Sequence, residues 1–429
     1  MNTDAVVSLS AIRPPSTPAQ RGEWAERETE EVLSRPFVRE FVFRNLRTVD
    51  GSTPHEAGDF LILHRGSGIL VEQKCQEDPT TRTAAKTELW ARKKAKAGWH
   101  QLRRALTRPK DRPVWCDHQR RGRVEFPEGL PVIRHGIVIV EVFQAVDLQP
   151  DANNLPLECS GIPISYLSVN DFLNLAVNLR TVPELTGYLT ARRLLPHEDL
   201  RVIGDEKALF QFYLLNGGSL VGCVGRADAR SAVAGQRHRV RELLERKAEA
   251  DHYSSLLEYV ADSFAANHPN FTLSLPQGMR EDTYDPAGLK TTSLEIQAEL
   301  ADLGLRERSV LGRALDAVIQ QLSDKKDGFR FMTARLDSKP EWVYVFGASK
   351  NVDPNEVQSR IMMLARGAMA YYEKRRCLLV LDRGGRSVIV SLSRHGFTPN
   401  LADFEIGRRL FGHLRVTSTP IELTPQCRG

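Results

Sequence analysis

Three ionisable residues, Asp59, Glu72 and Lys74, stand at the ends of two apolar, strand-like runs. Asp59 begins the run Phe60 to Leu63, and Glu72 and Lys74 end the run Ile69 to Val71. Two carboxylates and an ammonium at one place would suit a hard cation such as Mg²⁺, which is commonly held by one or two carboxylates with water and substrate phosphate. The ammonium could then orient or deprotonate an attacking water molecule, which is the chemistry of metal-assisted phosphate ester hydrolysis. The alternative is an aspartate at a turn and a surface Glu-x-Lys pair.

The two apolar runs flank Gly66-Ser67-Gly68, and this pattern predicts a β-hairpin. A loop of two or four residues would pair Asp59 with Lys74 and Leu61 with Glu72. Because side chains alternate across a strand, Asp59 would then lie on the same face as Glu72, roughly 5 Å away. A loop of three residues would instead turn Asp59 to the opposite face.

An Asp, a hairpin and then Glu-x-Lys form the signature of the PD-(D/E)XK nuclease superfamily, which Asp59 and Glu72-Gln73-Lys74 resemble. Gly58 stands where the Pro of the family name would be. The longer string resembles the restriction-endonuclease-like (Mrr-like) branch, in which a helix with Ala-Glu leads to an aromatic stretch, Glu-x-x-Asp and the Lys-ending strand. The matching segments are Ala25-Glu26, Phe37 to Asn45, Glu56-Ala57-Gly58-Asp59 and Glu72-Gln73-Lys74. The resemblance covers the chain to about residue 215.

This resemblance implies an α/β, restriction-endonuclease-like fold, with a mixed sheet flanked by helices. It also implies Mg²⁺, or Mn²⁺ in its place, bound by Asp59 and Glu72, with Glu26 completing the metal shell. Lys74 would position the water and polarise the phosphate, and Gln101 would support Lys74. The reaction would be hydrolysis of DNA phosphodiester bonds to 5′-phosphate and 3′-hydroxyl ends. Bacterial restriction or phage defence is the setting that this branch implies.

Two acidic positions are less clearly assigned: the carboxylate that the N-terminal helix would contribute, which is Glu26 or Glu28, and Glu56. The segment Gly22 to Ser34 is predicted to be helical, and on a helical wheel Glu28 falls within the apolar stripe whereas Glu26 lies at its edge. The resemblance favours Glu26 and the wheel favours Glu28. Glu56 matches the acid that precedes the Asp in this branch, but no role follows from its position.

A basic segment follows the hairpin. Residues 90–112 contain nine Lys or Arg residues and one Asp, and the part before Pro109 is predicted to be a helix. A basic helix beside a metal site would bind a phosphate backbone and contribute affinity without sequence readout; the alternative is a solvated charged face. The residues that we expect to contact DNA are Lys93, Lys94, Lys96, Arg103 and Arg104.

The bulk properties are those of a soluble chain of two or three domains, with 429 residues, 41% hydrophobic content and a net charge of +5. We find no apolar run long enough to span a membrane and no secretory signal, so we expect a cytoplasmic protein without membrane contact. Six widely spaced cysteines indicate neither a disulfide framework nor a zinc knuckle.

The remaining patterns predict a boundary near residue 220. Residues 131–146 form the strongest predicted strand. Its part from Val138 to Val142 is apolar on both faces apart from Glu141, as for a central strand covered by helices. Arg192 and Arg193, on the helix predicted from Pro183 to Leu195, are interpreted as surface residues rather than phosphate contacts. The predicted organisation is a flexible N-terminus (1–20), a nuclease-like domain (21–220), a linker and long helix (221–270) and a smaller α+β domain (271–429).

The C-terminal domain is predicted to contain a helix from Glu295 to Leu322, a strand from Trp342 to Phe346, a helix from Asn355 to Lys374 and two strands joined at Gly384-Gly385. Its role stays open between recruitment of a protein partner, formation of a homo-oligomer and target sensing. The rival to a nuclease is a protein that keeps the nuclease fold without catalysis and binds nucleic acid or regulates another protein.

Overall fold

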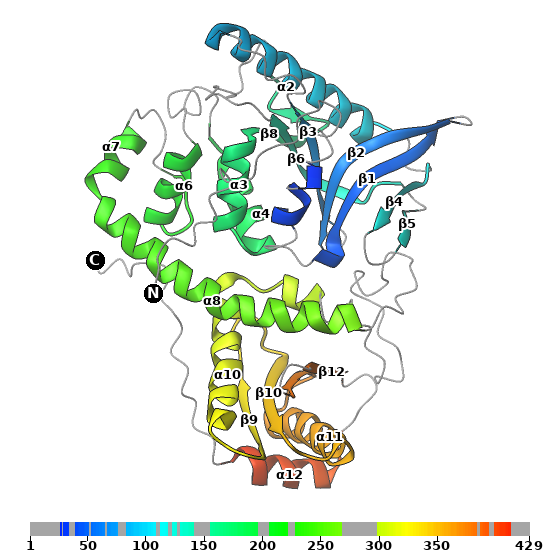
Figure 1. Cartoon of the computed structure of the whole chain (residues 1–429), viewed down its shortest axis with the longest axis vertical. Coiled ribbons are helices and arrows are strands. Elements are labelled where there is room, and N and C mark those ends of the chain that lie inside the picture. The colour runs from blue at the N-terminus through cyan, green and yellow to red at the C-terminus, as the bar shows by residue number, and fades with distance from the viewer. Residues whose placement is uncertain are drawn as a thin grey trace.

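The computed structural model of the chain describes residues 26–27, 29–33, 39–50, 53–64, 67–75, 83–108, 112–118, 122–126, 129–140, 155–195, 206–221, 228–267, 298–383, 387–393 and 399–412. Two sheets are present among these residues, and the long helix α8 (Arg237–Asn267) crosses between them (Figure 1). The expected N-terminal segment 1–20 lies outside the described residues.

The larger sheet is mixed and, within the described residues, has eight strands in the order β5-β4-β1-β2-β3-β6-β8-β7. Strands β3, β6 and β8 are parallel to one another, and all other neighbours are antiparallel. The strands are β1 (Val42–Asp50), β2 (Thr53–His64), β3 (Ser67–Lys74), β4 (Val114–His118), β5 (Gly122–Phe126), β6 (Val132–Val140), β7 (Glu158–Cys159) and β8 (Ile162–Ser168).

Helices cover both faces of this sheet, as the apolar strand patterns predict. On one face Leu61, Leu70 and Val138 pack with buried residues of helix α2 (Ala84–Leu106), which connects β3 to the chain leading to β6. On the other face Val71 and Ile139 belong to a core shared with three helices. These helices are α3 (Val169–Asn178), α4 (Val182–Arg193) and α6 (Glu206–Leu215). The expected α/β class with a mixed sheet between helices is therefore confirmed.

The second sheet has the order β12-β11-β10-β9, with β10 and β11 parallel and both outer pairs antiparallel. Helix α10 covers one face, and helices α11 and α12 cover the other. The smaller α+β unit that the sequence predicts is thus present. Its elements are α10 (Leu305–Ser323), β9 (Gly328–Ala334), β10 (Trp342–Lys350), α11 (Pro354–Tyr371), β11 (Arg376–Asp382), β12 (Ser387–Ser393) and α12 (Leu401–Phe411).

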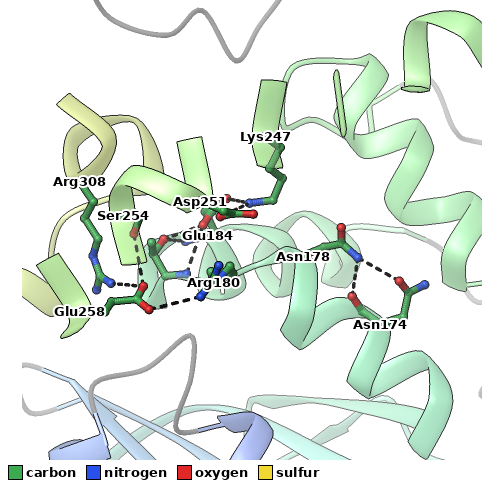
Figure 2. A network of polar contacts seen from close by, with 10 residues as sticks. Asn174, Asn178, Arg180, Glu184, Lys247, Asp251, Ser254, Glu258 and Arg308 are labelled. Carbon is green, nitrogen blue, oxygen red and sulfur yellow. Dashed lines mark hydrogen bonds and ion pairs between the residues drawn. The ribbon is translucent and has the colours of Figure 1, made fainter. Parts of the chain in front are cut away.

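Helix α8 links the two sheets through buried charge. Glu258 accepts hydrogen bonds from Arg308 Nη1 of α10 at 3.0 Å and from Arg180 Nη2, between α3 and α4, at 3.5 Å (Figure 2). About three turns earlier on the same face of α8, Lys247 Nζ donates to Glu184 Oε1 of α4 at 3.1 Å. These contacts tie the helices of the larger sheet to the first helix of the second unit.

Two elements differ from the sequence-based prediction. The expected helix from Glu295 to Leu322 is interrupted, because α10 begins after Gly304, whose backbone N–H is capped by Glu307. The expected linker region contains helix α7 (Asp228–Gly235), whose Val233 packs against α6 and α8. A helix cap sets the start of α10, and tertiary contacts stabilise α7. Hydrophobic periodicity predicts neither feature.

Candidate active site on the β2–β3 hairpin

The β2–β3 hairpin has a different register from the expected one. His64 pairs with Ser67, so only two residues separate the strands, and Leu61 pairs with Leu70 rather than with Glu72. The expected pairing of Asp59 with Lys74 was therefore wrong by two residues, because Ser67 belongs to the strand and not to the turn. A shift of two preserves the face of every side chain. Asp59 accordingly reaches the level of Glu72, on the face covered by α2.

The structure brings Asp59, Glu72 and Lys74 together at the open end of the hairpin, away from the turn between His64 and Ser67. Lys74 Nζ lies 3.2 Å from Glu72 Oε2 and 3.7 Å from Asp59 Oδ2. The Gln73 backbone N–H donates to Asp59 Oδ2 at 2.5 Å, and Lys74 Nζ donates to the Gln73 carbonyl oxygen at 3.0 Å. Asp59 and Glu72 are 4% and 1% exposed. One ammonium therefore lies against two buried carboxylates. The cluster of Asp59, Glu72 and Lys74 is called the pocket below.

The charges in this pocket perturb one another. Burial, and next the negative charge of Asp59, hold the pKa of Glu72 well above its ordinary value. Burial by itself would lower the pKa of Lys74, but the carboxylates of Asp59 and Glu72 outweigh it and raise that pKa. Lys74 is therefore an ammonium at neutral pH. In this state it can donate hydrogen bonds to water or phosphate oxygens, but it cannot accept a proton.

Glu56 joins the same group of charges. A side-chain hydrogen bond with Asp59, followed by partial burial and the charge of Asp59, raises the pKa of Glu56 from 4.5 to about 7. The residue as a whole is exposed, so Glu56 lies at the solvent side of the pocket while Asp59 and Glu72 lie inside. The sequence analysis assigned Glu56 no role. The residue that bears on the position of Glu56 is Gly58, two residues further along β2, where the pairing with β1 is irregular.

Glu26 lies close to this group but is held by an arginine. Arg44 Nη2 and Nε of β1 donate to Glu26 Oε2 at 2.8 and 3.2 Å, and Arg44 Nη1 lies 3.4 Å from Glu30 Oε2. The Glu26 charge makes a small contribution to the raised pKa of Glu56. Its carboxylate is thus neutralised from the β1 side, whereas the sequence analysis expected it in the metal shell. Glu28 lies outside the described residues.

Helix α2 crosses the sheet beside the pocket. A Cβ added at Gly98 would come within 2.7 Å of Val138, the β6 residue that pairs with Glu72. The helix backbone therefore touches the sheet at the level of Glu72. Gln101 lies one turn further along α2 and is half-buried. Within the described part of the chain, Lys74 contacts Asp59, Glu72 and the Gln73 carbonyl oxygen and not Gln101.

The expected DNA-contacting residues occupy the outer side of α2. Lys93, Lys96, Arg103 and Arg104 are exposed, and Lys94 is half-buried with Nζ 5.7 Å from the centre of the Trp90 ring. The Arg103 guanidinium lies 5.5 Å from the Trp99 ring centre. Both tryptophans pack partly into the core below α2. The exposed cations are thus displayed on a helix that the core holds in place.

Arg192 is a correction to the sequence analysis. It was expected on a helix surface, but it is 2% exposed and its Nε donates to Glu206 Oε1 at 2.8 Å. The hydroxyl of Tyr188 donates to the same oxygen at 2.6 Å. A helical wheel cannot report this, because the partner carboxylate comes from α6. Arg193 is exposed, as expected.

The donor set of the pocket fits a hard divalent cation. Among the residues that the structure describes, no three Asp, Glu, His or Cys side chains are already grouped as a metal site. Mg²⁺, however, is usually bound by one or two carboxylates and completed by water and substrate phosphate. Asp59 and Glu72 would hold it. Burial first, and the charge of Asp59 next, raise the pKa of Glu72, and a bound cation would favour its ionised form.

No protein-family model, no curated protein and no solved structure matches the chain. Within the described ranges, none of the helices is long and apolar enough to cross a lipid bilayer. The features that bear on function are therefore the charged side chains of the pocket and the exposed Lys and Arg residues of α2.

Proposed function

We propose that the chain is a Mg²⁺-dependent endonuclease of the restriction-endonuclease-like fold that hydrolyses phosphodiester bonds in DNA. The observation that carries the proposal is the contact of one lysine ammonium with two buried carboxylates at the end of a hairpin in the middle of a mixed sheet. Buried charges that perturb one another are typical of functional sites. The resemblance of Asp59 and Glu72-Gln73-Lys74 to the PD-(D/E)XK signature supports the same reaction.

The residues of the pocket suggest how the work is divided. Asp59 and Glu72 would hold the cation, which supplies charge neutralisation at the phosphate and a more acidic water when bound. The Lys74 ammonium donates to a non-bridging phosphate oxygen and holds the attacking water in line with the departing 3′ oxygen. The Gln73 N–H, through its bond to Asp59 Oδ2, fixes the orientation of that carboxylate. The products would carry a 5′-phosphate and a 3′-hydroxyl.

The outer side of α2 supports nucleic acid as the substrate. Its exposed Lys and Arg residues are carried by a helix whose backbone touches the sheet at the level of Glu72. Contacts to phosphates position a duplex without reading its sequence. The positive charge of α2 favours a polyanion as the ligand. That the polyanion is DNA is what the resemblance implies.

The direct test is plasmid cleavage with and without Mg²⁺. We expect Mg²⁺-dependent cleavage by the intact chain and a loss of roughly 100- to 1000-fold for Lys74→Ala and for Asp59→Asn, with DNA binding retained. Lys325→Ala, which removes an exposed lysine of the second unit, is the matched control and should cleave normally. Cleavage by Lys74→Ala at the rate of the unmodified chain would exclude the proposed mechanism.

One observation favours a second candidate. Lys74 already pairs with both carboxylates, so the cluster could be a closed ion pair in a protein that keeps the fold and only binds nucleic acid or regulates another protein. Such a protein would bind DNA equally well with or without Mg²⁺ and would show no cleavage in the same assay.

A further inference from the structure

The outer side of α2 has a histidine at its centre. His100 is exposed, and it lies on the side of the helix opposite the buried Leu102. Three cations lie within one turn of it, because Lys96 is four residues earlier and Arg103 and Arg104 are three and four residues later. Residues at these spacings are neighbours on a helix surface, with roughly 5–6 Å between their Cβ atoms. The imidazole therefore stands inside the row of exposed cations.

No carboxylate of α2 lies near this histidine. Glu88 is the one acidic residue of the helix, and it lies more than three turns before His100. Its Oε1 is 3.3 Å from Arg92 Nε. The closest aromatic ring is that of Trp99, whose centre is 4.9 Å from the centre of the imidazole. Among the described residues, His100 thus has cations beside it and neither a hydrogen bond nor an ion pair to a carboxylate.

The strands beneath α2 bring their charges to the opposite side of the helix. β2 and β3 contribute the pocket, in which Lys74 contacts both carboxylates. β6 contributes apolar residues to the layer under α2 and has the exposed Arg134 near its start. On β7, Cys159 packs under α2, so strand alternation directs Glu158 away from the helix. Helix α2 and the core under it therefore lie between the pocket charges and His100.

An anion laid along α2 would meet this imidazole. Histidine is the side chain that changes its charge most readily between pH 5 and pH 8. A negative charge placed a few ångström away favours the protonated form of an imidazole. A phosphate backbone that contacts Lys93, Lys96 and Arg103 would pass His100, because all four residues belong to one side of the helix. The backbone would thus supply the anionic partner that the described protein residues do not.

We propose that His100 is a further phosphate contact of α2, made in its protonated form, so that DNA binding takes up one proton. This inference rests on the proposed function, because it assumes that α2 binds the DNA backbone. The proton comes from solvent and is bound by the imidazole of His100, which then donates a hydrogen bond to a phosphate oxygen. Lowering the pH through neutrality should therefore strengthen the contact of this helix with DNA, independently of the carboxyl groups in the pocket.

The test is fluorescence anisotropy with a labelled DNA duplex near pH 6 and near pH 8, without divalent cation so that no cleavage occurs. We expect the slope of log Kobs against log salt to be steeper by roughly 0.9 near pH 6. The affinity should be roughly two- to fivefold higher there, which is the gain that an exposed ion pair supplies. His100→Gln should lose both increments, and His100→Arg should show the steeper slope at both pH values.

His252→Gln is the matched control. His252 is exposed on α8 and lies beside an aromatic ring, with its ring centre 5.2 Å from that of Tyr253, as His100 lies beside Trp99. Its substitution should leave the affinity and both pH increments as they are in the unmodified chain. Circular dichroism checks that each variant is folded.

The outcomes separate this inference from the proposed function. Increments of the same size in His100→Gln and in the unmodified chain would overturn only this inference, because DNA would still be bound. An equal loss in His252→Gln would overturn it too, since the effect would then not belong to α2. If the unmodified chain binds the duplex near neither pH, the proposed function fails together with this inference.

Discussion

The pocket on the hairpin contains more acid than base. Glu56, Asp59 and Glu72 face the single ammonium of Lys74, and two of these three carboxyl groups have raised pKa values. Each carboxyl can reduce the repulsion by binding a proton or by sharing a cation. The two responses compete, so proton binding and metal binding at this site must be linked.

This linkage gives a pH prediction. Glu56 has a folded-state pKa of about 7 against an ordinary value of 4.5, so between these values the folded chain binds more protons than the unfolded chain. Stability without metal should therefore fall as pH rises through this window, and Glu72 acts in the same direction. Mn²⁺ should raise the melting temperature little near pH 5 and much more near pH 8. Thermal melts with and without Mn²⁺ at several pH values measure this.

A second buried acid, Asp251, also makes stability depend on pH, and it has to be separated from the effect of the pocket. On α8, burial raises the pKa of Asp251 from 3.8 to about 6, so this residue adds a pH-dependent loss of stability of the same sign. That contribution is unaffected by Mn²⁺, and the difference between melts with and without metal isolates the pocket. Glu56→Gln should make the difference less dependent on pH. A Mn²⁺ effect that is equally large at both ends of the pH range would contradict the prediction.

At the scale of elements, the irregular pairing of β2 with β1 just before Asp59 is a β-bulge, and it depends on Gly58. In Gly58→Ala the new Cβ would meet Leu70 Cδ1 at 2.9 Å, which a flexible side chain can relieve, but the φ of +149° would remain strained. We expect a destabilisation of roughly 1–3 kcal/mol and a displacement of the neighbouring Asp59 carboxylate. Mn²⁺ affinity should fall because Asp59 is one of the two proposed ligands. Calorimetric titration of this variant measures it.

Gly122→Ala is the matched control for Gly58→Ala. Gly122 has a φ of +65° at the start of β5, with open space around it, so alanine there should cost about 1 kcal/mol. Its Mn²⁺ affinity should equal that of the unmodified chain. Equal affinities for both variants would mean that the bulge does not place a metal ligand.

Helix α2 carries a separate prediction about nucleic acid. The combined substitution of Lys93, Lys96 and Arg103 by alanine should weaken DNA binding and lower the slope of log Kobs against log salt by roughly 2–3, because each phosphate contact contributes about 0.9. Fluorescence anisotropy at several salt concentrations measures the slope. Substituting the exposed Lys325, Lys326 and Arg330 of the second unit removes the same charge and should leave the slope unchanged. Equal slopes for the two triple variants would exclude α2 as the binding face.

The comparison of sequence with structure shows which features local patterns can predict. The shared face of Asp59 and Glu72 was predictable only for a loop of two or four residues, because alternation along a strand is preserved when the register shifts by two, whereas a loop of three would have reversed it. The register itself was not, since Ser67 has no feature that assigns it to a strand rather than a turn. The β2 bulge before Asp59 could not be predicted, because it depends on pairing with β1, where the sequence analysis noted only the aromatic stretch from Phe37 to Asn45.

At the scale of the whole molecule, the pocket and the second unit meet opposite parts of the same strand. His64, at the hairpin end of β2, lies 3.2 Å from Asp302, just before α10. Asp59 is five residues back along β2, or roughly 17 Å away at 3.4 Å per residue. Lys339 also contacts Asp302. The second unit is therefore joined to the sheet that carries the pocket, and among the described residues this ion-pair contact with β2 lies at the turn end of the hairpin.

The junction around α8 gives the last prediction. Arg308 is 2% exposed and donates to Glu258 of α8 and to the Leu300 carbonyl oxygen. Its removal leaves the partly buried Glu258 carboxylate with hydrogen bonds from Ser254 and Arg180 among the described residues (Figure 2). Arg308→Met should lower the free energy of unfolding by roughly 3 kcal/mol, whereas Arg306→Met, at an exposed site on the same helix, should change it by less than about 0.5 kcal/mol. Urea unfolding followed by circular dichroism measures both. Because the loosened junction lies far from Asp59, Mn²⁺ affinity should be unchanged in Arg308→Met. A loss of affinity in that variant would show that the second unit acts on the pocket through α8, and would contradict the separation argued from the hairpin geometry.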